Sequence, residues 1–189
     1  LNEYVEIGKL LGYKQLALTD DGVLHGAVEF YERCIQKGIQ PILGCTFETA
    51  WKSDASKKEM LVVYAKGSKG YEALMKLSTL YQQGFTWTKE MSELIVTHSE
   101  DVKIALPPMD SEWVAAYSKG RLEAVLESVK REYPGVEIAV GITREMVERG
   151  EFDKMREGIE AAGVLPIAFS VSRYLNTTDY FPWKVLQAI

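Results

Sequence analysis

Two residue types that carry much of protein chemistry are scarce in this 189-residue sequence, which has two cysteines and two histidines. Cys34 and Cys45 form neither a C-x-x-C motif nor a multi-cysteine framework. This fits a reducing compartment better than secretion and predicts two buried free thiols. No apolar run approaches the roughly 18 residues of a membrane span, and no basic-then-apolar leader is present. We therefore expect a cytoplasmic protein without a membrane partner.

The sequence also lacks an excess of basic residues, because its formal net charge is −5. Gripping a nucleic-acid backbone requires clustered Lys and Arg side chains, so any role with DNA should be local or indirect. No G-x-x-x-x-G-K-[ST] or G-x-G-x-x-G phosphate loop occurs, and no G-x-S-x-G nucleophile elbow occurs either. These absences exclude the nucleotide-binding and serine-hydrolase classes that such motifs define.

The apolar periodicity alternates between strand-like and helix-like segments. Helices are predicted at residues 2–12, 25–37, 70–84, 119–132, 143–162 and 180–189, and strands at 15–20, 39–50, 60–66, 102–107, 136–141 and 164–170. Two polar segments, 51–59 and 84–93, are interpreted as surface loops. Strands separated by helices favour parallel pairing through right-handed crossovers, so we expect an α/β sheet or barrel with a single core.

Acidic residues follow the first predicted strand in "LALTDDGVLHGAVEF". In a parallel barrel the functional residues lie at the C-terminal ends of the strands, and Asp20, Asp21, Thr46 and the residues after Phe169 are expected at such ends. The two aspartates have two interpretations. They either hold a metal ion, or they accept backbone N–H bonds in a turn and favour the start of the next helix.

Three segments carry a family resemblance in the same order and spacing: "LALTDDGVLHGAVEFYERCIQKGIQPILGC", "GYEALMKLS" and "VLPIAFSVSRYLNTTDYFPWKVLQAI". They resemble the polymerase and histidinol phosphatase (PHP) domain at the N-terminus of bacterial DNA polymerase III alpha subunits, with a doubled aspartate that suggests the low-GC Gram-positive type. The resemblance implies a distorted seven-stranded (β/α) TIM-like barrel. We expect one PHP domain over residues 1–189, N-terminally incomplete, with its first strand lying before Leu1 in a much larger polymerase chain.

The family's metal-binding members hold divalent ions at the C-terminal strand ends and hydrolyse phosphoesters. Histidine nitrogens and carboxylates suit Zn²⁺ or Mn²⁺, and paired metals generate hydroxide and polarise phosphate. The family's opening H-x-H would lie upstream of Leu1. Its T-D-H-G histidine falls at Asp21, the glutamate after G-C falls at Thr46, and its N-D-x-H-Y motif corresponds to "SVSRY", with Val171 and Arg173 in the ligand positions.

These substitutions predict that no intact metal site, no catalytic residue and no cofactor belong to this chain. Arginine is permanently cationic and cannot ligate a metal, so Arg173 would add charge where a cation should bind. His25 is a weak candidate ligand, and His98 is interpreted as an ordinary surface residue. The vestigial positions are Asp20, Asp21, Thr46, Val171 and Arg173.

The leading functional hypothesis is a structural and interaction module of a replicative DNA polymerase. Polymerisation would reside in a palm domain elsewhere in the parent chain, where carboxylates hold Mg²⁺. The implied partners are the other domains of the alpha subunit and, through the full-length enzyme, replisome proteins and DNA. The competing hypothesis is a metal-dependent phosphoesterase or 3′-5′ exonuclease using Asp20, Asp21 and His25 with Zn²⁺ or Mn²⁺. A free-standing regulatory relative is the third possibility.

Overall fold

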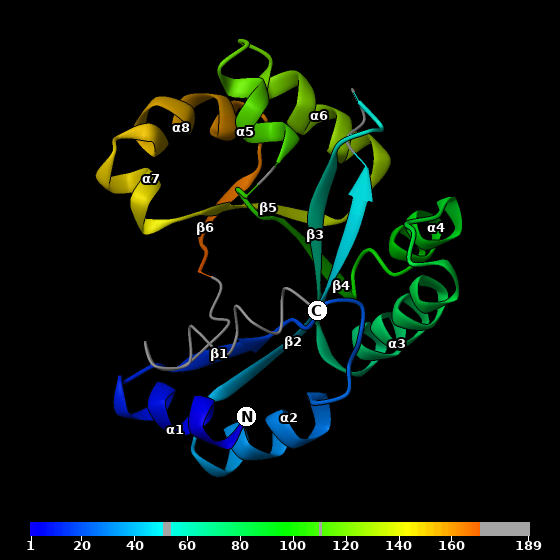
Figure 1. Ribbon diagram of the computed structural model, residues 1–189, viewed down its shortest axis with the longest axis vertical. Coiled ribbons are helices and arrows are strands. Elements are labelled where there is room, and N and C mark those ends of the chain that lie inside the picture. The colour runs from blue at the N-terminus through cyan, green and yellow to red at the C-terminus, as the bar shows by residue number, and fades with distance from the viewer. Residues whose placement is uncertain (51–53, 110, 171–189) are drawn as a thin grey trace.

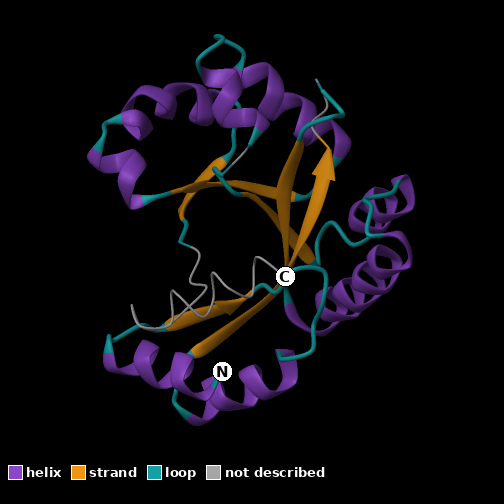
Figure 2. Ribbon diagram, in the orientation of Figure 1, coloured by secondary structure: helices purple, strands orange, loops and turns teal. Residues whose placement is uncertain are grey.

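The described strands form one curled sheet in a computed structural model that describes residues 1–50, 54–109 and 111–170 (Figure 1). The strands follow one another in chain order across this sheet. They are β1 (Gln15–Leu18), β2 (Gln40–Ala50), β3 (Lys58–Ala65), β4 (Val102–Leu106), β5 (Glu137–Ile142) and β6 (Leu165–Ala168). Helices cover the convex face, so the six strands make a half-barrel (Figure 2).

The described helices all lie between strands or before the first strand. They are α1 (Asn2–Leu10), α2 (Ala27–Gln36), α3 (Gly67–Gly84), α4 (Lys89–Thr97), α5 (Glu112–Tyr117), α6 (Leu122–Glu132), α7 (Arg144–Glu148) and α8 (Glu151–Ala161). In the part of the chain that the structure describes, no helix is both long and apolar enough to cross a membrane. The helix predicted at residues 180–189 lies outside the described residues.

The direction of β3 corrects the expectation of parallel pairing. β1 and β2 pair in parallel, as do β4, β5 and β6, but β3 runs antiparallel to both β2 and β4. Ala65 at the end of β3 pairs with Val102 at the start of β4, so the chain leaves and re-enters the sheet at the same end. Two helices, α3 and α4, lie between these strands and return the chain to that end.

Alternation along the strands separates a helix-facing side from a concave side. Cys45, Val63, Ile104 and Val140 are fully buried in the main hydrophobic cluster beneath the helices. Thr46 pairs with Val62, Val62 with Ala105 and Ala105 with Ala139, so these neighbours form a row of the opposite parity across the sheet. Both faces of β3 are covered at its centre, since Leu61, Val62 and Val63 are all buried.

The described helices differ from the predicted elements in three places. Segment 84–93 is not entirely a loop, because α4 begins at Lys89 after Thr88, whose side chain caps the helix by accepting a hydrogen bond from the Met91 N–H. The short helix α5, capped by Ser111, was not predicted. The single helix expected over 143–162 is divided into α7 and α8 by Gly150, which has a positive φ of 66° and so interrupts the helical backbone.

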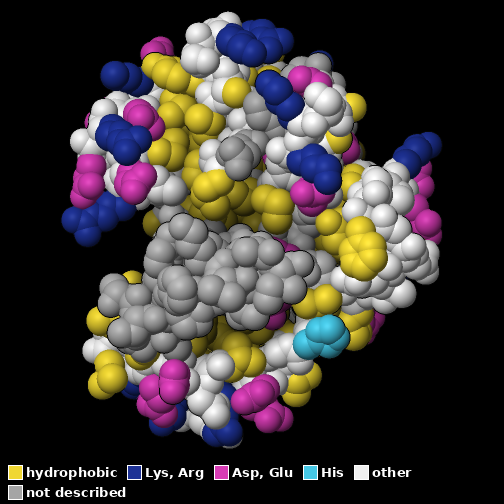
Figure 3. All heavy atoms as spheres, viewed as in Figure 1, with side chains coloured by type: hydrophobic (Ala, Val, Ile, Leu, Met, Phe, Trp, Pro, Cys, Tyr) yellow, Lys and Arg dark blue, Asp and Glu magenta, His cyan; other side chains and the backbone are white. Residues whose placement is uncertain are grey.

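The buried apolar residues of the half-barrel form two clusters, where the sequence predicted a single core. The larger cluster lies under α3 to α8 and includes Phe47, Leu74 and Trp113. The smaller cluster lies under α1 and α2 and consists of Val5, Leu16, Phe30, Cys34 and Ile39. On the face drawn in Figure 3, hydrophobic side chains gather towards the middle of the molecule, while acidic and basic side chains lie mainly on the outer helices.

Candidate functional site

The turn after β1 is attached to β2 by backbone hydrogen bonds. Asp21 forms an isolated parallel bridge with Thr46. The Thr46 N–H donates to the Asp20 carbonyl at 3.0 Å, and the Gly22 N–H donates to the Thr46 carbonyl at 2.8 Å. The two motifs T-D-x-G and G-C-T therefore meet, as the sequence predicted. Thr46 does not end its strand, however, because β2 continues past it to Ala50.

Thr46 holds the end of β1 through its side chain. Its hydroxyl donates to the Thr19 carbonyl at 2.8 Å, and the residue is only 8% exposed. The neighbouring Cys45 thiol donates weakly to the Asp20 carbonyl at 3.4 Å. Burial raises the pKa of Cys45 to about 12, so this thiol stays protonated at neutral pH and is a poor nucleophile. Both residues therefore support the backbone of the turn.

Helix α3 supports the turn from the other side. The Ser78 hydroxyl donates to the Gly22 carbonyl at 2.7 Å, and the Gln82 side-chain amide donates to the same oxygen at 3.0 Å. Gly22 has a φ of +69°, and a Cβ at this position would lie 2.8 Å from the Tyr81 ring. Only glycine fits here without strain, which explains the glycine of the T-D-x-G turn.

The electrostatics of the turn reflect two neighbouring carboxylates. The pKa of Asp20 is raised, first by partial desolvation and then by the negative charge of Asp21, and the nearby His25 acts in the opposite direction. Asp20, Asp21 and His25 are all exposed, and His25 precedes α2 by two residues. The structure therefore brings these three candidates into one region with Thr46. Val171 and Arg173 lie outside the described residues.

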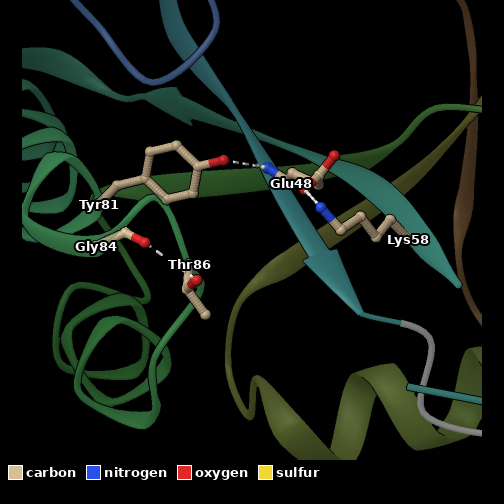
Figure 4. Close-up of polar contacts among 5 residues, drawn as sticks. All are labelled: Glu48, Lys58, Tyr81, Gly84 and Thr86. Atoms are coloured by element: carbon tan, nitrogen blue, oxygen red, sulfur yellow. Dashed lines mark hydrogen bonds and ion pairs between the residues drawn. The ribbon is translucent and has the colours of Figure 1, made fainter. Parts of the chain in front are cut away.

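Beyond Thr46, β2 carries a polar contact that sequence reasoning missed (Figure 4). The Glu48 N–H donates to the Tyr81 hydroxyl at 3.3 Å, and the Glu48 carboxylate forms an ion pair with Lys58 of β3. The Tyr81 ring packs edge-on against Phe47, with ring centroids 5.3 Å apart. At the end of α3, the Thr86 hydroxyl donates to the Gly84 carbonyl at 3.2 Å. The helical spacing of apolar residues in α3 indicates that Tyr81 lies on the buried face of the helix. The sequence does not indicate its partner, because the partner depends on how α3 lies against the sheet.

His98 is less exposed than an ordinary surface residue. Its side chain is 20% exposed, and its Nδ1 atom lies 3.5 Å from an Asp101 carboxylate oxygen at the start of β4. It is remote in the fold from the turn after β1, because β4 begins at the opposite end of the sheet. His98 is therefore not part of the candidate site.

The turn after β1 offers two carboxylates and one imidazole as donors for a divalent ion. Zn²⁺ and Mn²⁺ take four or more ligands, mainly imidazole and carboxylate. Within residues 1–50, 54–109 and 111–170, no group of three or more His, Cys, Asp or Glu side chains is arranged to hold a metal. The Thr46 hydroxyl already donates to a backbone carbonyl. The described residues alone do not make a cluster site of the kind expected of the family's metal-binding members.

Comparison with known proteins agrees with this architecture. The chain is 32% identical to the DNA polymerase III subunit alpha of Halalkalibacterium halodurans over 98% of its length, but spans only 17% of that relative. It is 40% identical to the Bacillus subtilis subunit over 43% of the chain and 7% of the relative. An amidohydrolase from Chromobacterium violaceum, solved with bound sulfate and no metal, shares the fold, with a TM-score of 0.52 and 10% identity over 97% of this chain and 90% of the other.

The family assignment follows from the match over most of the chain. The family described as the PHP domain matches residues 1–161. This range includes all of the turn after β1, the Thr46 position and strands β1 to β5. The chain therefore belongs to the PHP domain family.

Proposed function

We propose that this chain is the PHP module of a replicative DNA polymerase III alpha subunit, in which it acts as a structural and interaction module. The observation that carries the proposal is the similarity to such a subunit along 98% of the chain. The matched region is only 17% of that relative, as expected for one module of a larger protein. The parent enzyme would extend DNA, with Mg²⁺ held by carboxylates of its palm domain. The module would pack against other domains of that subunit and reach replisome proteins and DNA through them.

The absence of metal chemistry is the second part of the proposal. Thr46, at the position of the family's glutamate ligand, uses its hydroxyl to hold the end of β1. Asp21, at the position of a histidine ligand, is bridged to Thr46 through the backbone. Both sequence positions thus have a structural use that requires no ion. The competing function, a metal-dependent phosphoesterase or 3′-5′ exonuclease, has Asp20, Asp21 and His25 in its favour.

Elemental analysis of the purified polymerase chain, followed by hydrolysis of a 3′-labelled single strand with added Mn²⁺ or Zn²⁺, tests this proposal. We expect primer extension with Mg²⁺, no stoichiometric Zn or Mn, and no hydrolysis that depends on the PHP module. Bound metal with hydrolysis that disappears on Asp21→Ala would establish the competing function. Asp54→Ala is the matched control, since this partly exposed aspartate lies between β2 and β3, away from the turn after β1. A chain that does not extend primers would contradict the assignment to a polymerase.

We also propose that residues 1–189 are one domain and that its barrel closes with a seventh strand. A cavity of about 910 Å³ lies between α1 and β1 on one side and β6 and α7 on the other. Leu16 and Ala17 of β1 and Pro166 and Ile167 of β6 line it, so the two edge strands face a common apolar space. A strand in this space would pair with both edges. Slow amide exchange at both β1 and β6 in the full-length chain would support closure, and fast exchange at both would contradict it.

A further inference from the structure

Helix α2 carries two apolar stripes, of which the sheet covers one. Ala27, Phe30 and Cys34 are buried, with exposed fractions of 1% or less. Val28, Tyr31 and Ile35, hereafter the open stripe, are 62%, 48% and 54% exposed. Their spacing of three and four residues is that of a helix face that packs against another helix. The open stripe is therefore patterned for helix packing but is exposed in the described structure.

The angular positions of these residues show how unusual the helix is. At about 100° per residue, the buried stripe and the open stripe each occupy about 60° and together span about 160° of the helix circumference. A helix that buries one face against a core needs about 100° of apolar surface. The sheet and α1 account for the first stripe, because α2 packs on β1, β2 and α1. In the described structure, the open stripe is apolar helix surface beyond that which packs on the sheet and α1.

The charges beside the two stripes differ. On the side of the buried stripe, Lys37 forms an ion pair with Glu6 of α1. On the side of the open stripe, the next residues around the helix are Glu32, Gln36 and Glu29, all of which are exposed. The free rim of the open stripe is therefore acidic. A helix that covers the stripe would place its own flanking residues against Glu32 and Glu29, where lysine or arginine would be favourable and acidic residues would repel.

We propose that the open stripe docks an amphipathic helix with an apolar seam and a basic rim, and that this helix belongs to another domain of the same polymerase polypeptide. The source of the helix rests on the proposed function, since the chain corresponds to only 17% of a polymerase subunit. A second copy of this chain is a poorer occupant. Two copies packed through α2 would bring acidic rims together, and each carries a formal net charge of −5.

The chemistry of the partner is tested with two synthetic helical peptides that share a leucine seam and differ only in Lys or Glu flanks. We expect the Lys-flanked peptide to bind the 189-residue protein at least tenfold more tightly than the Glu-flanked one. The double variant Val28→Glu/Ile35→Glu should weaken this binding at least tenfold, whereas Val147→Glu, an equally exposed valine on α7, should not. Equal affinity for the two peptides, or binding unaffected by the double variant, would overturn the proposal.

Two further experiments test the proposal if the double variant is poorly folded. Glu32→Lys leaves the open stripe intact and should reduce the preference for the Lys-flanked peptide at least threefold. Sedimentation of the unmodified protein should show a monomer. A dimer that dissociates in the Val28→Glu/Ile35→Glu variant, with no peptide binding, would identify a second copy as the occupant and contradict our proposal.

The source of the helix is tested by thiol labelling of Ile35→Cys, because the two native cysteines are buried. We expect labelling at least tenfold slower in the full-length polymerase chain than in the 189-residue protein. Ser118→Cys, at an exposed position after α5, should label at similar rates in both. Equal rates at position 35 in a chain that extends primers would overturn the inference and leave the proposed function standing. A full-length chain without primer extension would contradict the proposed function instead.

Discussion

The pKa values of acidic residues are shifted in opposite directions at the two ends of the sheet. At the C-terminal end of β1, Asp20 and Asp21 are adjacent, and the pKa of Asp20 is raised by desolvation and by its neighbour. At the other end, Glu137 at the start of β5 lies between two lysines. Its carboxylate oxygens are 2.6 Å from the Lys103 Nζ atom and 3.5 Å from the Lys66 Nζ atom. These lysines lower the pKa of Glu137.

This contrast separates residues that stabilise the fold from residues that do not. The folded protein favours the ionised form of Glu137, so this charge contributes to stability at neutral pH. The folded protein disfavours the ionised form of Asp20, so the fold would be more stable at neutral pH without that charge. Unfavourable charge arrangements are concentrated at functional sites, and this one lies where the resemblance predicts the metal-binding positions of the family. This end of the sheet therefore keeps the Asp20 charge, which the fold does not need, beside a Thr46 that the fold does use.

The largest effect that we expect at the carboxylate end comes from Thr46→Val. Valine has almost the same shape but cannot donate to the Thr19 carbonyl, so a partly buried acceptor loses its partner. Such a loss costs about 1–2 kcal/mol of unfolding free energy, which urea denaturation measures.

The control for this prediction is Thr79→Val, which removes a similar 2.8 Å hydrogen bond to the Met75 carbonyl on the exposed side of α3. Water replaces the lost donor there, so the change should stay within about 0.5 kcal/mol. Equal losses of unfolding free energy at the two positions would mean that Thr46 has no special role in holding the end of β1. The contrast between residues that stabilise the fold and residues that do not would then fail for Thr46.

Much of the sheet could be predicted from sequence because its strands are short apolar segments, several of which lie next to glycine or proline. The antiparallel direction of β3 relative to β2 was missed although the sequence indicated it. Residues 51–59 between these strands were interpreted as a loop, and parallel strands need a longer crossover connection. The antiparallel pairing of β3 with β4 was missed because helix α4 was missed, since α3 alone would have carried the chain to the far end of the sheet. Thr88, the N-cap of α4, was the available signal, but its polar surroundings suggested a loop.

The candidate site was predictable in position but not in detail. The meeting of Asp21 with Thr46 follows from two motifs at neighbouring strands, and the structure confirms it. The contacts of Gly22 with Ser78 and Gln82 depend on the crossing of α3 over the turn. They connect residues about 60 positions apart in the sequence, and no periodicity in the sequence predicts them. Long-range packing, not local pattern, decides these contacts.

Removing the charge at the lysine end should have a smaller effect than Thr46→Val. Glu137→Gln should lower the unfolding free energy at pH 7 by about 0.5 kcal/mol, because the carboxylate and both lysines are partly exposed and water screens them. The pKa of Glu137 is lowered from 4.5, so its contribution is present above pH 4.5 and disappears as the pH falls through the folded pKa. The variant and the unmodified protein should therefore converge at low pH. A difference that persists below that range would assign the effect to packing.

The smallest change, Asp20→Asn, should have the opposite sign. The pKa of Asp20 in the folded protein is raised above 3.8, so its ionisation lowers stability as the pH rises from 3.8 through the folded pKa. At pH 7 the neutral amide should raise the urea midpoint slightly, and the gain should vanish at low pH, where the carboxyl is protonated in both states. Added Mn²⁺ gives the sharper measurement. If the carboxylate pair holds a cation, Mn²⁺ should stabilise the unmodified protein more than the variant. If both respond equally, the pair is a turn feature without a ligand, as the proposed function requires.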